Sequence, residues 1–157
     1  MSQDDSIERF YREHASSVYA FLVSLCRDRT WAEDLMHDTF VKATLAMGGY
    51  RGGSPRAWLF AIARNVFVDD ARRRRPVPTE QIESTATSDT DITEVDAIER
   101  VLAGLPERQR MALVMSDHGG LTASEVGAVL GLTPGAARVL IHRARHAFRS
   151  VYERDYQ

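Results

Sequence analysis

The apolar residues of this chain recur at helical spacing along its length. In the first segment, residues 6–27, they fall at helical spacings, at Ile7, Phe10, Tyr11, Val18, Phe21, Leu22 and Leu25. This spacing lines one face of an amphipathic helix. Because no stretch alternates apolar and polar residues as a half-buried strand does, the pattern predicts an all-α protein.

Two further helices are predicted before residue 76. Thr30 and Glu33 have capping-box spacing, which predicts a helix from about residue 30 to Met47. Glycines between 48 and 53 interrupt the chain. Ser54 followed by Pro55 is a good N-cap and first-turn pair, so a third helix is expected to start there and to stop at Pro76.

Shorter helices are predicted near the C-terminus. Segments 94–105 and 106–118 have helical periodicity, and the second ends at a glycine pair. Thr122 and Glu125 form another capping box, and Gly131 is a C-terminal stop. Thr133 then caps a last helix with Pro134 in its first turn.

The segment between these groups, residues 76–93, consists largely of Pro, Ser, Thr and acidic residues. This composition is typical of a flexible linker, and a coil of that length spans on the order of 25 Å. The fold class predicted is therefore two small helical domains, residues 1–75 and 94–157, joined by a flexible acidic linker and able to sit apart. The second domain contains a helix-turn-helix.

The net charge of −2 conceals a strong asymmetry. Residues 61–75 hold five arginines against two acids, residues 76–107 hold eight acids against one arginine, and the chain after Glu107 holds seven arginines against four acids. Two basic regions flank an acidic one. This distribution favours two nucleic-acid-binding surfaces, although the total charge does not.

The last helix has the pattern of a DNA-reading element. A short helix, the turn "GLT" and a longer basic helix are typical of helix-turn-helix proteins. The inward stripe is expected at Ala137, Ile141, Ala144 and Phe148. The other side carries Gly135, Val139, His142 and His146, with Arg138, Arg143, Arg145 and Arg149 around them. Arginine binds phosphates or guanine in a major groove; the alternative is a solvated basic helix.

The third helix carries more aromatic bulk than one inward stripe needs. Leu59, Ile62, Ala63 and Val66 form that stripe, so Trp58, Phe60 and Phe67 must be covered by something else. Asn65, Asp69 and Arg72 form a polar row that ends in a run of arginines. Aromatic and arginine side chains together favour binding of an unstacked strand. The alternatives are a core role for Trp58 and a helix end stabilised by the macrodipole for residues 72–75.

The second helix has an acidic pair, Asp34 and Asp38, whose like charges repel slightly. Lys42 could relieve this repulsion. The alternative is a docking face for a basic protein surface, with Leu35 and Phe40 alongside. The spacing alone does not distinguish a pair relieved by Lys42 from a docking face.

Other chemistry is not expected. A single cysteine, Cys26, excludes an internal disulfide and a cysteine-based zinc site, and the five histidines form no metal or catalytic constellation. His142 and His146, at i and i+4, could bind a metal only adventitiously. No apolar run reaches about 18 residues, and the N-terminal segment is acidic. A cytoplasmic, soluble protein is expected, with no enzymatic activity, cofactor, metal or membrane insertion.

With these elements in order, the sequence resembles an extracytoplasmic-function (ECF) sigma factor of bacterial RNA polymerase. The motifs "AEDLMHDTFVKA", "SPRAWLFAIARNVFVDDARRRR", "LPERQRMALVM" and "LTASEVGAVLGLTPGAARVLIHRARHAF" resemble those of the family, in order and spacing across nearly the whole chain. The resemblance implies two domains: sigma region 2, which binds core polymerase and captures the melted minus-ten element, and sigma region 4, which reads the minus-thirty-five duplex.

The resemblance also assigns residues. Contacts to the clamp of the largest polymerase subunit are implied for Asp34, Leu35, Asp38 and Phe40. Capture of the melted strand is implied for Tyr50, Trp58, Arg64, Asn65 and Asp69, with Arg72 and Arg73 following. Duplex contacts are expected at Thr133, Arg138, Val139, His142, Arg143 and Arg145. The chain departs from the family pattern at Val139 and Leu140, which replace a hydroxyl and a charge, so Val139 could meet a thymine methyl group.

The implied partners are core RNA polymerase, promoter DNA in duplex and single-stranded form, and an anti-sigma factor. The alternative is a helix-turn-helix repressor or adaptor that acts without polymerase. That alternative explains Arg138 and Arg143 but leaves the aromatic residues around Trp58 unexplained.

Overall fold

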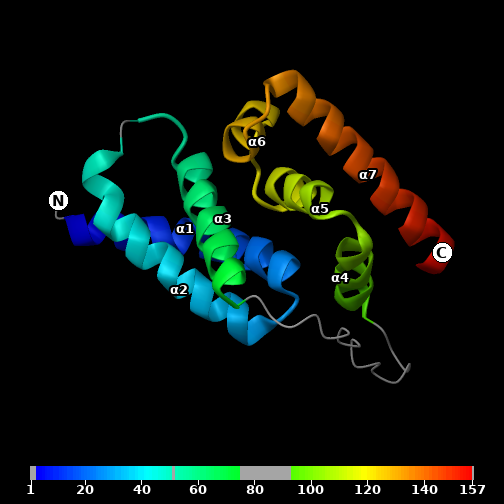
Figure 1. Cartoon of the computed structure of the whole chain (residues 1–157), viewed down its shortest axis with the longest axis horizontal. Coiled ribbons are helices and arrows are strands. Elements are labelled where there is room, and N and C mark those ends of the chain that lie inside the picture. Colours follow the sequence, from blue (N-terminus) through cyan, green and yellow to red (C-terminus); the bar gives the residue numbers. More distant parts are fainter. Residues whose placement is uncertain (1–2, 51, 75–92, 157) are drawn as a thin grey trace.

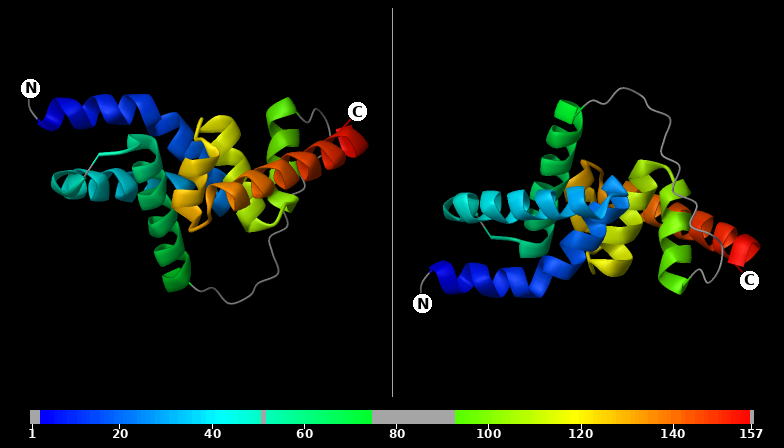
Figure 2. Two further views of the ribbon diagram at one scale, coloured as in Figure 1. Left: turned by 90° about the horizontal axis from the view of Figure 1, so that it is seen from above. Right: turned by 90° about the horizontal axis from the view of Figure 1, so that it is seen from below.

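The computed structural model describes residues 3–50, 52–74 and 93–156, and every regular element in these ranges is helical (Figure 1). The all-α prediction is confirmed. Most of the predicted linker, residues 76–92, lies outside the described residues. The two termini lie at opposite ends of the molecule (Figure 2).

The N-terminal unit contains three long helices: α1 (Gln3–Cys26), α2 (Arg29–Ala46) and α3 (Pro55–Arg74), with a short 3₁₀ turn, η1 (Met47–Gly49), after α2. The predicted N-cap of α3 is confirmed, because the Ser54 hydroxyl accepts a hydrogen bond from the Ala57 N–H at 3.1 Å.

The predicted start of α2 at Thr30 was wrong. Asp28 caps this helix, and its carboxylate accepts hydrogen bonds from the N–H groups of Thr30 and Trp31 at 3.0 and 3.1 Å. A carboxylate at this position satisfies two backbone donors and also complements the helix dipole. Arg27, with a left-handed φ of 58°, makes the turn from α1.

The C-terminal unit comprises α4 (Glu94–Gly104), α5 (Glu107–Leu113), η2 (Val114–His118), α6 (Ala123–Leu130) and α7 (Pro134–Tyr156). The capping box of Thr122 and Glu125 is confirmed, and so is the stop at Gly131, whose φ of 75° is left-handed. Thr93 and Asp96 form a second capping box that the sequence reading did not identify.

The predicted single helix over 106–118 is divided in the structure. After α5 the chain widens into the π turn η2, and the Gly119 N–H donates to the Val114 carbonyl, five residues back, at 2.9 Å. Local hydrogen-bonding patterns of this kind are not visible in apolar periodicity.

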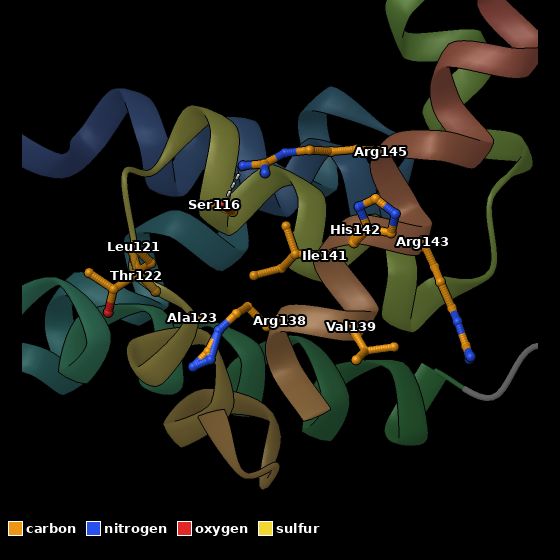
Figure 3. A pocket seen from close by; sticks show the side chains of 10 residues that line it. All are labelled: Ser116, Leu121, Thr122, Ala123, Arg138, Val139, Ile141, His142, Arg143 and Arg145. Carbon is orange, nitrogen blue, oxygen red and sulfur yellow. Dashed lines mark hydrogen bonds between the residues drawn. The ribbon is translucent and has the colours of Figure 1, made fainter. Parts of the chain in front are cut away.

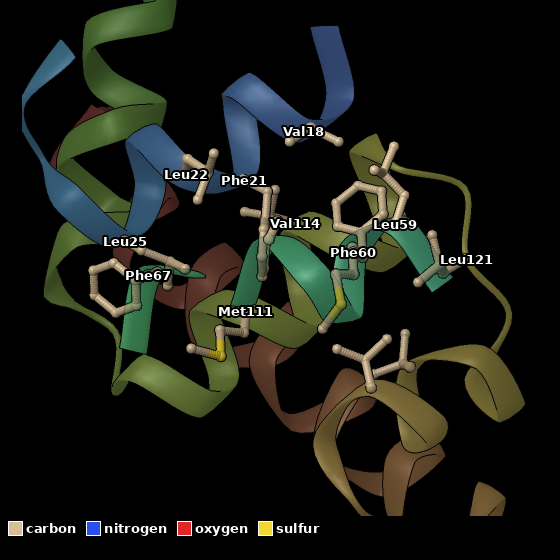
Figure 4. Packing of buried hydrophobic residues seen from close by; sticks show 14 of the residues in the cluster. Val18, Phe21, Leu22, Leu25, Leu59, Phe60, Phe67, Met111, Val114 and Leu121 are labelled. Atoms are coloured by element: carbon tan, nitrogen blue, oxygen red, sulfur yellow. The ribbon is translucent and has the colours of Figure 1, made fainter. Parts of the chain in front are cut away.

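One apolar core joins the two units rather than leaving them apart (Figure 4). Phe60 of α3 is fully buried and its ring lies 5.1 Å from that of Phe21 in α1, centroid to centroid. Met111 and Met115 of the C-terminal unit belong to the same cluster. We expected another element to cover the aromatic residues of α3. For Phe60, that element is the C-terminal unit.

Arg110 is the buried charged residue of this junction, with 9% of its surface exposed. Its guanidinium donates to the carbonyls of Leu102 and Leu105, at 2.9 and 2.8 Å, and also to that of Ser24 at the end of α1, at 3.2 Å. Burial lowers the pKa of Arg110 from its ordinary value. The side chain thus closes the end of α4 and ties it to α1.

Arg110→Ala is expected to lower the free energy of unfolding by about 2–4 kcal/mol, because several buried carbonyls lose their donor. Denaturant unfolding measures this loss. Arg108→Ala is the matched control, since Arg108 is exposed and donates to a single carbonyl, that of Leu130. Equal losses in the two variants would contradict the role given to Arg110.

Candidate nucleic-acid and polymerase interfaces

Helix α7 presents the predicted reading face to solvent. Ala137, Ile141 and Ala144 are buried, and Phe148 is half-buried, so the inward stripe is as predicted. The opposite side exposes Arg138, Val139, His142 and Arg143. Thr133 caps the helix by accepting a hydrogen bond from the Ala136 N–H at 3.1 Å.

A groove runs between this face and the start of α6 (Figure 3). Leu121, Thr122 and Ala123 form one side, and Arg138, Val139 and His142 are among the α7 residues of the other. Arg143 points away from Ser116, whereas Arg145 points toward it (Figure 3). The face therefore offers cations, an imidazole and one apolar contact within a single surface.

Arg145 is engaged within the protein. Its Nε donates to the Asp117 carboxylate at 3.0 Å, and a terminal nitrogen donates to the Ser116 hydroxyl at 3.1 Å. The hydrogen bond to the Asp117 carboxylate raises the pKa of Arg145. Arg138 and Arg143 have no such ion pair among the described residues, so they are the freer of the three predicted arginines.

Trp58 of α3 stands at the centre of an aromatic cluster. Its ring lies 5.2 Å from Tyr50 and 6.1 Å, edge-on, from Phe10 of α1, measured between centroids. The Tyr50 hydroxyl donates to the Gly53 carbonyl at 2.6 Å, which fixes the turn before α3. Trp58 is half-buried, so its exposure lies between that expected of a core residue and that expected of a ring free to stack on bases. Phe10 was missed because the sequence pattern places it only in the core of α1.

Further along α3, Asn65, Asp69 and Arg72 are exposed, as the predicted polar row requires. Arg64 is half-buried, and its Nε is buried without a partner in the described residues. Arg73 reaches Asp70 at 3.4 Å, so it is less free than Arg72.

Asp70 organises the end of α3. Its carboxylate accepts from the Trp31 indole N–H at 2.7 Å and from Arg74 Nε at 3.0 Å, and the Arg74 guanidinium lies 4.4 Å above the Trp31 ring. The hydrogen bond from Trp31, followed by those from Arg74 and Arg73, lowers the pKa of Asp70 below its ordinary value. This network covers Trp31 and was not predicted.

The predicted polymerase face of α2 divides into two groups. Asp34 and Asp38 are exposed, but Leu35 and Phe40 are only 1% and 8% exposed because they pack in the core. The apolar residues on the exposed side are instead Val41 and Leu45, the latter 81% exposed. With Asp34 and Asp38 they follow helical spacing along one stripe, which the sequence could have shown.

Other sites are limited in the described ranges. They contain no cluster of three or more His, Cys, Asp or Glu side chains placed to hold a metal ion. Burial raises the pKa of Cys26 to about 12. No single described helix is both long and apolar enough to cross a membrane; only α6 and α7 taken together, with a 100° bend between them, have sufficient length and apolar composition.

Comparison with known families matches both units. The model of sigma-70 region 2 matches residues 10–77, and that of sigma-70 region 4 matches residues 96–147. The chain is 32% identical to the RNA polymerase sigma factor CarQ of Myxococcus xanthus, over 94% of this chain and 89% of the relative. It is 27% identical to the ECF sigma factor SigM of Bacillus subtilis, over 95% and 96%.

Two further comparisons agree. The ECF sigma factor SigE of Mycolicibacterium smegmatis is 31% identical over 92% of this chain, which spans only 60% of that relative. Among solved structures, the sigma factor RpoE of Bartonella quintana, crystallised with the anti-sigma factor NepR, superposes with a TM-score of 0.75 at 25% identity, over 94% of this chain and 99% of that one. The chain belongs to the sigma-70 family, as an ECF sigma factor.

The Asp70 network makes stability depend on pH. Because the folded-state pKa of Asp70 is lowered, its contribution is present above the ordinary aspartate pKa of about 3.9 and is lost as pH falls through the folded value. Asp70→Asn is expected to lose less stability than wild type between neutral pH and about pH 3. Denaturant unfolding followed by tryptophan fluorescence measures this. Asp69→Asn, which alters an exposed neighbour outside the network, is the control. If wild type and Asp70→Asn lost the same free energy of unfolding on acidification, the assignment would be contradicted.

Proposed function

We propose that this protein binds core RNA polymerase and directs it to promoters, the N-terminal unit capturing the melted minus-ten strand and the C-terminal unit reading the minus-thirty-five duplex. The observation that carries the proposal is the presence, on one chain, of an exposed basic helix-turn-helix face and a separate aromatic and arginine-bearing helix. The two match different regions of one family. The protein acts in the cytoplasm and has no catalysis of its own.

The upstream element is read by α7. Arg138 and Arg143 are exposed cations that suit phosphate or guanine, and His142 lies between them on the same face. Val139, 48% exposed, offers an apolar contact that suits a thymine methyl group. Thr133 stands at the N-terminal end of the helix, where a phosphate is favoured. Arg145 contributes less because Asp117 holds it.

The melted strand binds along α3 and the turn before it. Tyr50 and Trp58 present aromatic rings for base stacking, and Asn65, Asp69 and Arg72 continue the surface. Arg64 and Arg73 assist once they leave their present positions. Polymerase binds the stripe of α2 with Asp34 and Asp38, to which we add Val41 and Leu45, while Leu35 and Phe40 support this stripe from beneath.

An anti-sigma factor is a further proposed partner. RpoE of Bartonella quintana was crystallised with the anti-sigma factor NepR. CnrH, a fold neighbour with a TM-score of 0.72 and 24% identity, was solved in complex with the cytosolic domain of CnrY. The similarity to RpoE over 94% of this chain supports a partner of the same kind here.

Transcription from fragmented DNA of the native genome, with bacterial core polymerase, tests the proposal. Addition of the protein is expected to produce transcripts with defined start sites. If the protein bound core polymerase yet produced no new start site, or did not bind at all, the proposed function would be wrong.

Arg138→Ala and Arg143→Ala are each expected to weaken promoter-duplex binding by the holoenzyme about five- to a hundredfold, as expected when a base or phosphate contact is lost. Arg145→Ala is expected to cost clearly less, because its charge is already paired with Asp117. Gel-shift titration on an upstream-element duplex measures all three. An Arg145 loss as large as that of Arg138 would contradict the assignment.

Leu45→Asp is expected to weaken binding to core polymerase at least tenfold, because it places a charge in an apolar contact. Fluorescence anisotropy with labelled protein measures the dissociation constant. Ala46→Asp, the adjacent exposed residue outside the stripe, is the matched control. A similar effect of the two variants would show that the stripe is not the contact surface.

A further inference from the structure

An ion pair stands at the edge of the α7 reading face. Arg138, His142 and Arg145 follow one another at helical spacing, i, i+4 and i+7, so they share one stripe of α7. All three are exposed, and all three line the groove between α7 and the start of α6 (Figure 3). By its position alone, Arg145 belongs to the same surface as Arg138.

Asp117 of η2 holds this arginine through two of its nitrogens. Nε of Arg145 donates to the two carboxylate oxygens at 3.0 and 3.3 Å, and a terminal nitrogen donates to the same carboxylate and to the Ser116 hydroxyl. Paired hydrogen bonds of this fork-like kind are stronger than a single contact between the same charges. The side chains of Arg145 and Asp117 nevertheless remain 47% and 48% exposed, so the pair is open to an approaching phosphate.

A DNA phosphate and the Asp117 carboxylate compete for the same nitrogens, because both accept fork-like hydrogen bonds from arginine. A phosphate that displaced Asp117 from Arg145 would also remain close to the carboxylate, and two negative charges at such a distance repel each other. Arg138 and Arg143 have no ion pair among the described residues. The reading face therefore offers two free arginines and a third whose charge is neutralised.

We propose that Asp117 limits the sequence-independent affinity of α7 for DNA by withholding Arg145 from the phosphates. Phosphate contacts supply most of non-specific binding, whereas base contacts distinguish one sequence from another. A third free arginine would strengthen binding to every duplex, and nearly all the duplex in a genome lies outside the sites to be found. This inference rests on the proposed duplex reading by α7 and names a residue that tunes it.

Asp117→Asn tests this role, because asparagine keeps one oxygen acceptor for Arg145 but removes the charge that holds it. The full chain is titrated by fluorescence anisotropy against a labelled duplex of scrambled sequence, at several salt concentrations. The variant is expected to bind about three- to tenfold more tightly at low salt, and the slope of log K against log salt is expected to steepen by about 0.9, the value for one added phosphate contact. Asp117→Glu, which keeps the charge, is expected to retain the wild-type slope.

Asp155→Asn is the matched control. Asp155 pairs with Arg154 at 3.0 Å near the end of α7, so its replacement changes the net charge equally and also frees one arginine. Arg154 lies about four and a half turns beyond Arg138, which places it on the opposite side of the helix. Asp155→Asn is therefore expected to leave the slope unchanged. If both variants steepened the slope equally, net charge would be the cause and the proposal would be wrong.

Arg145→Ala identifies the arginine responsible. In the wild-type background it is expected to leave the affinity for the scrambled duplex nearly unchanged, and in the Asp117→Asn background it is expected to cancel the gain. A gain that persists without Arg145, or an unchanged slope in Asp117→Asn that is folded by circular dichroism, would overturn the proposal. The proposed function fails separately, if core polymerase with the protein initiates nowhere. The titrations need no polymerase and still decide the role of Asp117.

Discussion

The rest of the structure depends on the burial of the apolar side of α3. Three helices leave Phe60 without cover on one side, and full burial of a large aromatic side chain is worth on the order of 2–3 kcal/mol. The C-terminal unit supplies that cover through Gly119 and the methionines around it. Because a Cβ at position 119 would also meet the Met115 carbonyl at 2.8 Å, only glycine allows this close approach.

This junction sets the orientation of both functional surfaces. With Ala137, Ile141 and Ala144 anchored inward, α7 must turn Arg138, Val139 and Arg143 outward. With Phe60 facing the C-terminal unit, α3 directs Asn65 and Asp69 to solvent while Arg64 remains half-buried. The upstream reading face is therefore open in this arrangement, whereas the strand-binding side is partly covered.

Much of the fold could be predicted because its signals are local. The capping box of Thr122 and Glu125, the stop at Gly131 and the inward stripe of α7 depend on residues within a few positions of one another. The start of α2 was misplaced because two possible caps, Asp28 and Thr30, stand close together. The division between α5 and η2 was not predicted, because the spacing of apolar residues does not change there.

The prediction of the sites was weakest where tertiary contacts decide exposure. Leu35 and Phe40 share helix α2 with exposed acids, and only packing against neighbouring helices shows that both are buried. Arg145 forms an ion pair with Asp117, which is 28 residues away in the sequence. Arg73 and Arg74 form ion pairs with Asp70, which lies about one helical turn before them. The sequence alone did not show that these arginines are paired. The close packing of the two units depends on pairs such as Phe60 and Gly119, which no local pattern connects.

The most direct measurement is the distance between the two units, free and bound to polymerase. Spin labels at Lys42 of α2 and Arg154 of α7, both exposed, report it by pulsed electron paramagnetic resonance in the full chain. The account predicts a single narrow distance distribution in the free protein, because one apolar core joins the two units, and a longer distance in the complex with core polymerase and promoter DNA, where the units bind separate promoter elements. An unchanged distance in a transcriptionally active complex would contradict it.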